Sequence, residues 1–194
     1  MKATICLAMS LTIAALSLGA TQETPLPGDS VYQLKAHLKD STGQAVDWQS
    51  LRGKPRIATM FYTSCPFICP LTVDSLRSIE RSLPPGERSR LSFVLISMDP
   101  ERDTPARLAA VKSERHLDPH AWLLLRPEPQ DLRSIAGMLG VRYRALANGE
   151  FNHTTTLVLL DADGRVLART ERVGSNDDPE FLSAVRAAAK AAKQ

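Results

Sequence analysis

The segment from Leu91 to Met98 is a nearly continuous apolar run. A short run of this kind is typical of a strand that is buried on both faces, as in the centre of a parallel sheet. Arg56 to Tyr62 has the same character. Between the two runs, Pro70 to Leu83 carries apolar residues close to helical spacing, and Pro84-Pro85-Gly86 ends that helix. Strand, helix and strand in this order predict an α/β protein.

The remaining elements follow from the same periodicities and from turn residues. The predicted strands and helices are Val31 to Leu38, Ala45 to Trp48, Pro105 to Arg115, Ala121 to Leu125, Gln130 to Leu139, a hairpin of Thr154 to Leu160 with Arg165 to Thr170, and a helix from Pro179 to Lys190. Thr104 is a suitable N-cap for the helix that begins at Pro105. This order predicts a thioredoxin-like fold with an N-terminal β-hairpin extension and an inserted hairpin before the C-terminal helix.

Two cysteines lie where the strand ending near Tyr62 gives way to a helix. Cys65 and Cys69 are four positions apart, so their sulfurs can converge on one side of a first helical turn. Cys69 is expected at or just inside the helix N-terminus, where the helix dipole favours a thiolate and lowers its pKa. The pair is predicted to be a redox-active dithiol or a pair of ligands for a soft metal ion such as Cu(I). A permanent structural disulfide is the alternative, although so short a loop adds little stability.

His153 is the candidate third ligand. In thioredoxin-like oxidoreductases the chain entering the hairpin strand passes beside the active cysteines, usually with a cis-proline. This chain has Asn152-His153-Thr154 there and no proline. An imidazole at that position would favour a metal, whereas a cis-proline shields the thiols from one. The other histidines, His37, His116 and His120, are interpreted as structural or solvated.

The N-terminal segment predicts export. Lys2 supplies a positive start, Ile5 to Leu18 is mainly apolar, and small residues follow. Residues 1–20 are therefore predicted to be a signal peptide, residues 21–30 a tether and residues 31–194 one domain. A retained membrane anchor is the alternative, although the apolar run is short for a span.

Composition argues against a nucleic-acid partner. The formal net charge is +3, charges of both signs are interspersed, and aromatic residues are 5% of the chain. Cys6 falls within the predicted signal peptide. The mature chain then has two cysteines, too few for a disulfide scaffold.

Three segments resemble the signature segments of the Sco/SenC family. They are Thr63-Ser64-Cys65-Pro66-Phe67-Ile68-Cys69-Pro70, Ile96-Ser97-Met98-Asp99-Pro100-Glu101-Arg102-Asp103-Thr104-Pro105 and His153-Thr154-Thr155. The resemblance covers about Tyr32 to Leu182. It implies a thioredoxin-like domain at an energy-transducing membrane, on the periplasmic side, that holds one Cu(I) or Cu(II) through Cys65, Cys69 and His153.

The same resemblance implies a part in assembling the binuclear copper centre of cytochrome c oxidase. The protein would deliver copper to the copper-bearing subunit, or to another periplasmic copper or thiol protein, or keep that site's cysteines reduced. The sequence departs from many members at Phe67, where a small or acidic residue is usual, and at Asn152, where aspartate is common. Residues that contact metal ligands orient them and change the affinity of the site for its metal.

Two functions besides copper binding remain to be compared. The first is a thiol–disulfide oxidoreductase that acts through Cys65 and Cys69 without a metal. The second is a peroxidase of the peroxiredoxin type, which requires threonine three residues before the reactive cysteine. Pro66 and Tyr62 occupy those positions, so neither cysteine fits. Asp99 is expected at a strand end near the cysteines, and Asp103 or Thr104 is expected to cap the next helix.

Overall fold

The computed structural model describes residues 24–66, 68–174 and 178–192. The predicted signal peptide, the first residues of the predicted tether and Phe67 lie outside this description. None of the helices within it is both long enough and apolar enough to cross a membrane.

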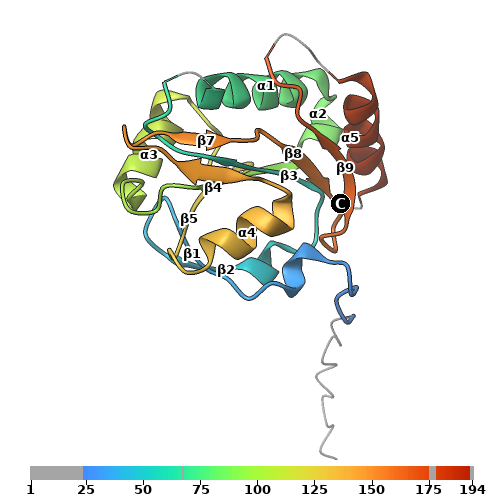
Figure 1. The fold of residues 1–194 in the computed structure, drawn as a ribbon. Helices are drawn as coiled ribbons and strands as arrows, with labels where there is room; N and C mark the ends of the chain where they lie inside the picture. Colours follow the sequence, from blue (N-terminus) through green and yellow to red (C-terminus); the bar gives the residue numbers. More distant parts are fainter. Residues whose placement is uncertain (1–23, 67, 175–177, 193–194) are drawn as a thin grey trace, which may run out of the picture.

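One mixed sheet forms the centre of the molecule (Figure 1). Its strands are β1 (His37–Asp40), β2 (Ala45–Asp47), β3 (Arg56–Phe61), β4 (Ser92–Ser97), β5 (Trp122–Pro127), β8 (Leu157–Leu160) and β9 (Val166–Thr170), in the order β2-β1-β5-β4-β3-β8-β9. β3, β4 and β5 are parallel, and the flanking pairs β1–β5 and β3–β8 are antiparallel. The α/β class and the thioredoxin-like order are confirmed.

Helices lie on both sides of this sheet. They are α1 (Ile68–Ser82), α2 (Pro85–Arg88), α3 (Pro105–Glu114), α4 (Leu132–Leu139) and α5 (Pro179–Ala191). In Figure 1, α1 lies above the sheet, α5 lies at its right and α4 lies below it. Thr104 caps α3 as predicted, because its hydroxyl accepts a hydrogen bond from the Arg107 N–H (3.3 Å).

Burial explains why the apolar runs became central strands. Every residue of β3 and β4 is buried. Phe93 and Trp122 stack across neighbouring strands with ring centroids 4.4 Å apart. Burying a side chain of such size contributes about 1.5–3 kcal/mol. Met60 and Met98 belong to this core rather than to a metal site.

The predicted strand over Val31 to Leu38 is wrong for residues 31–36. A 3₁₀ helix, η1 (Val31–Gln33), begins there because the Ser30 hydroxyl accepts a hydrogen bond from Tyr32 N–H (3.1 Å). Tyr32 is fully buried and packs edge-to-face on Trp48, the first residue of a second 3₁₀ helix, η2 (Trp48–Leu51). The compact 3₁₀ turn places the Tyr32 ring in the core against Trp48. The strand β1 begins only at His37. The N-terminal β1–β2 hairpin is confirmed.

A second hairpin was not predicted. It joins β6 (Tyr143–Ala145) to β7 (Phe151–His153) in a separate two-stranded sheet. It precedes the predicted β8–β9 hairpin, which is also present. Because β7 ends at His153, this small sheet decides where the candidate imidazole lies.

Candidate metal and dithiol site

Cys65 and Cys69 lie together at the N-terminus of α1. A turn follows β3, in which Cys65 N–H donates to the Tyr62 carbonyl (3.3 Å), and Cys69 is in the first turn of the helix. Cys69 N–H donates to Cys65 Sγ (3.4 Å), and Tyr62 N–H donates to Cys69 Sγ (3.4 Å). Both residues are thiols rather than halves of a disulfide in this structure. The sulfurs therefore converge as the four-residue spacing predicts.

The expected lowering of the Cys69 pKa is wrong for this conformation. Cys69 is only 6% exposed, and burial raises the pKa of its thiol. The hydrogen bond from Tyr62 N–H opposes this, while the neighbouring Cys65 raises the pKa further. Desolvation of the thiolate thus outweighs the favourable helix terminus. Burial therefore favours the thiol form of Cys69 in this conformation.

His153 lies on the inner face of the β6–β7 hairpin and does not join the sulfurs in one cluster. Its ring packs edge-to-face on Tyr62, with centroids 5.9 Å apart, and its Nδ1 lies 3.1 Å from the Thr154 carbonyl. Within the described residues, no three His, Cys, Asp or Glu side chains are grouped closely enough to hold a metal. A hydrogen bond from Nδ1 would leave Nε2 with its lone pair for a ligand role.

Tyr62 is the residue that connects the two halves of the candidate site, and sequence reasoning gave it no role. Its ring contacts both His153 and Phe151, and its hydroxyl accepts a long hydrogen bond from Phe151 N–H (3.5 Å). Burial raises the pKa of Tyr62 to about 12, and the neighbouring Cys65 and Cys69 contribute to the rise. Its position at the exit of β3, directly before the cysteine loop, is the sequence signal that could have indicated it.

Asp103 anchors the cysteine loop from below. It is fully buried, and its carboxylate accepts hydrogen bonds from Thr63 N–H, from the Thr63 hydroxyl (2.5 Å) and from the Ser97 hydroxyl (2.6 Å). Burial raises the pKa of Asp103. Thr63 therefore supports the cysteine loop through Asp103, and Asp103 joins this loop to the end of β4 rather than capping α3.

Asp99 and Arg102 hold the other side of the site. Asp99 is buried at the end of β4, and Arg102 Nε donates to its carboxylate (2.5 Å). The same guanidinium donates through Nη2 to the carbonyl of Gly149, in the turn between β6 and β7. Gly149 has φ +80°, a conformation that favours glycine. Arg102 thus fastens the tip of the hairpin that carries His153.

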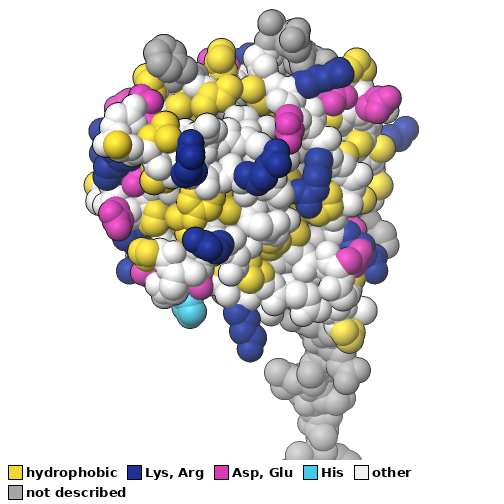
Figure 2. Space-filling view, in the orientation of Figure 1, with side chains coloured by type: hydrophobic (Ala, Val, Ile, Leu, Met, Phe, Trp, Pro, Cys, Tyr) yellow, Lys and Arg dark blue, Asp and Glu magenta, His cyan; other side chains and the backbone are white. Residues whose placement is uncertain are grey.

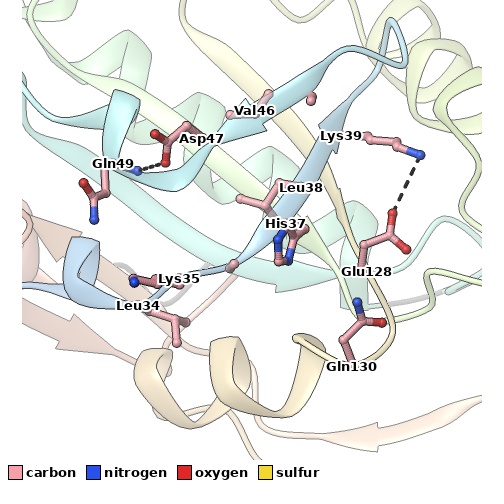
Figure 3. Close-up of a pocket in the computed structure, with 12 residues that line it drawn as sticks. Leu34, Lys35, His37, Leu38, Lys39, Val46, Asp47, Gln49, Glu128 and Gln130 are labelled. Carbon is pink, nitrogen blue, oxygen red and sulfur yellow. Dashed lines mark hydrogen bonds and ion pairs between the residues drawn. The ribbon is translucent and has the colours of Figure 1, made fainter.

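The hollow that borders the cysteines is separate from the groove beside the N-terminal hairpin. A cavity of about 110 Å³ borders both cysteines and also Glu114 and Arg115. A groove of about 710 Å³ lies instead beside β1 and β2, and Figure 3 shows Lys39 and Glu128 paired across it (3.7 Å). The larger groove includes neither cysteine, so it is not part of the candidate site.

The other histidines lie where they were expected. His37 is 78% exposed and pairs with Asp131 (3.0 Å), and His116 and His120 are exposed.

Comparison with known proteins identifies the family of this chain. The family described as SCO1/SenC matches residues 28–190. The chain belongs to this family. The membership confirms the resemblance of the three signature segments. A Stutzerimonas stutzeri protein, provisionally named as copper-binding, is 30% identical over 131 residues, which are 66% of this chain and 63% of that protein's own length.

Other members of the SCO1/SenC family agree over more of the chain. The SCO2-like protein of Rickettsia felis is 28% identical over 161 residues, or 76% of each chain. The structure of Bradyrhizobium japonicum ScoI with copper bound is 27% identical, covers 79% of this chain and 96% of its own, and has a TM-score of 0.65.

Proposed function

We propose that this SCO1/SenC member is an exported protein that binds one copper ion through Cys65, Cys69 and His153. One observation carries the proposal: two sulfurs converge at the N-terminus of α1, and the His153 imidazole packs on Tyr62, the residue whose N–H donates to Cys69 Sγ. Thiolate and imidazole are ligands that suit Cu(I). The copper-bound relative described above supports the same assignment.

The donor set fits copper as a cargo that is loaded and released. Both thiols must lose a proton on binding, so copper affinity should rise with pH. The raised pKa of Cys69 increases that proton cost in the copper-free state. His153 also has to move closer to the sulfurs, because the three side chains are not grouped closely enough to hold a metal in this structure. Both features favour a site that binds copper tightly only after a rearrangement.

The acceptor that we propose is the binuclear copper centre of cytochrome c oxidase. The protein would deliver copper to the copper-bearing subunit or keep that site's cysteines reduced, in the periplasm and near a membrane surface. Membership of the SCO1/SenC family supports this assignment, and the N-terminal apolar segment supports export. N-terminal sequencing of the mature protein from fractionated cells tests export: a chain starting near residue 21 is expected, and an intact Met1 in the soluble cytoplasmic fraction would contradict it.

A thiol–disulfide oxidoreductase is the second candidate, favoured by the contact of both thiols with one cavity. In such exchange Cys65 and Cys69 would become a disulfide. The two protons and two electrons that they lose would reduce a partner disulfide to two thiols. His153 separates the two functions, because only copper binding needs it.

An anaerobic Cu(I) titration of the reduced protein against a competing chelator tests the proposal. One tightly bound copper is expected, weakened by Cys65→Ser, by Cys69→Ser and by His153→Ala. His120→Ala, at an exposed histidine elsewhere, is the matched control and should change nothing. If His153→Ala leaves the affinity unchanged while dithiol exchange proceeds, the oxidoreductase function replaces copper binding.

A further inference from the structure

The outer edge of β6 has no neighbouring strand among the described residues, because β6 and β7 form a sheet by themselves. At one end of the hairpin, Thr154 N–H donates to the Arg142 carbonyl (2.9 Å). At the other end, Leu146 N–H donates to the Glu150 carbonyl (2.8 Å). Hydrogen-bonded pairs alternate in an antiparallel ladder. The N–H and C=O groups of Tyr143 and Ala145 therefore point away from β7.

The opposite edge of the hairpin shows the same alternation. Phe151 lies opposite Ala145, so its N–H should also point outward, on the far side of β7. It does, because it donates to the Tyr62 hydroxyl. The outer edge of β7 is therefore partly satisfied by the body of the protein, while the outer edge of β6 opens on a groove.

That groove, of about 590 Å³, lies between β6 and α4. Its apolar part includes Gly137 and Val141, and three exposed arginines surround it: Arg133, Arg142 and Arg144. None of the three has a carboxylate partner among the ion pairs of the described residues. Figure 2 shows Lys and Arg side chains standing around apolar surface on the face that carries α4 and β7.

We propose that an extended acidic segment of a partner protein binds this groove and adds to β6 as a third, antiparallel strand. Main-chain hydrogen bonds would come from Tyr143 and Ala145, and charge complementarity from the three arginines. A second copy of this chain fits poorly, since pairing two β6 edges would bring like charges together. A concave groove with an open strand edge also suits a peptide chain better than a flat anionic membrane.

The geometry specifies how the side chains of that segment must alternate. Its hydrogen-bonded residues would lie opposite Tyr143 and Ala145, on the inner face, and should be apolar. The residues between them would lie on the face of Arg142 and Arg144 and should be acidic. Tyr143 is also the direct cross-strand neighbour of His153, so the partner would dock beside the candidate copper ligand. The docking itself does not depend on copper.

The probe for this proposal is a capped, fluorescent peptide of alternating glutamate and valine, titrated into the full protein at low ionic strength. Binding is expected to weaken as salt is added, because exposed charges are screened. N-methylation of the valines removes the N–H groups that face β6 and should abolish binding. N-methylation of the glutamates alters only the other edge and should leave binding largely intact.

Variants test the groove from the protein side. Reversal of two charges in Arg142→Glu/Arg144→Glu should weaken binding by about tenfold. Arg107→Glu, at an exposed arginine of α3, is the matched control. Gly137→Gln should also weaken binding, by filling the groove, and it should fold normally because a Cβ at Gly137 meets nothing within 4 Å.

Amide hydrogen exchange locates the bound peptide. The Tyr143 and Ala145 amides should become protected, whereas the Arg144 amide, which already faces β7, should change little. The proposal is overturned if the peptide does not bind, if valine N-methylation has no effect, or if Arg107→Glu weakens binding as much as the double reversal. Preference for anionic vesicles over the peptide, or peptide-independent dimerisation through β6, would overturn it as well.

Discussion

At the residue scale, the two cysteines show that burial can outweigh a helix terminus. Cys69 lies in the first turn of α1, where the dipole favours a thiolate, yet burial raises its pKa. Sequence position identifies which sulfurs can meet, but their protonation depends on how much protein covers them. The burial of the Cys69 side chain depends on residues that are distant in the sequence.

The first prediction concerns the reactivity of Cys69 in the reduced, copper-free protein. Because burial raises its pKa, alkylation by iodoacetamide should keep accelerating at pH values where an unstructured cysteine, with a pKa of about 8.5, has already levelled off. Mass spectrometry of the peptides after timed alkylation measures the rate at this residue. The urea-unfolded protein is the control, and a plateau at the same or lower pH in the folded protein would contradict the prediction.

A second prediction follows from Asp103, whose pKa is raised by burial. Between the unfolded pKa of about 3.9 and the raised folded pKa, the folded state holds a proton that the unfolded state has lost. Stability contributed by the protonated carboxyl is therefore present at low pH and lost as pH rises through that window. The free energy of unfolding of the wild type, minus that of Asp103→Asn, should fall across it. Urea denaturation measures this, and a difference that is constant or grows with pH would disprove the assignment.

At the element scale, the site depends on a hairpin that is fastened at its tip. Arg102 joins the buried Asp99 to the Gly149 carbonyl in the β6–β7 turn. Strands this short give little periodic signal, so sequence reasoning placed His153 before a strand rather than at the end of one. The inner position of Tyr143 and Phe151 becomes evident only once their packing is known.

A third prediction is that Arg102→Gln loosens this hairpin without unfolding the protein. Arg102 is 47% exposed, so the change should cost less than about 1 kcal/mol of global stability. The Thr154 and Leu146 amides, which hold the two ends of the hairpin, should nevertheless exchange faster with solvent. Arg165→Gln breaks a more exposed ion pair, with Asp29, and should leave both amides unchanged. Equal exchange in all three proteins would show that Arg102 does not hold the hairpin.

At the scale of the whole molecule, stability should reside in the central parallel strands. Leu95 on β4 is fully buried, whereas Leu167 on the edge strand β9 is 50% exposed. Sequence reasoning predicted β4 well, because continuous apolar runs report burial on both faces.

The fourth prediction compares these two leucines. Leu95→Ala should lower the free energy of unfolding by about 2–5 kcal/mol, through lost burial and the cavity it leaves. Leu167→Ala should change it by less than about 0.5 kcal/mol. Urea unfolding curves with matched slopes provide the comparison. Similar losses in both variants would contradict the central position of β4.

The sequence by itself determined the elements that carry their own signal: the apolar strands β3 and β4, the cap of α3, and the four-residue spacing that lets two sulfurs meet. These depend on neighbours along the chain. The tertiary structure alone decided the 3₁₀ turn at Tyr32, the burial that keeps Cys69 a thiol, and the packing of His153 on the Tyr62 ring. Each of these depends on residues brought together by folding, and their effects on desolvation and packing exist only once the chain is compact.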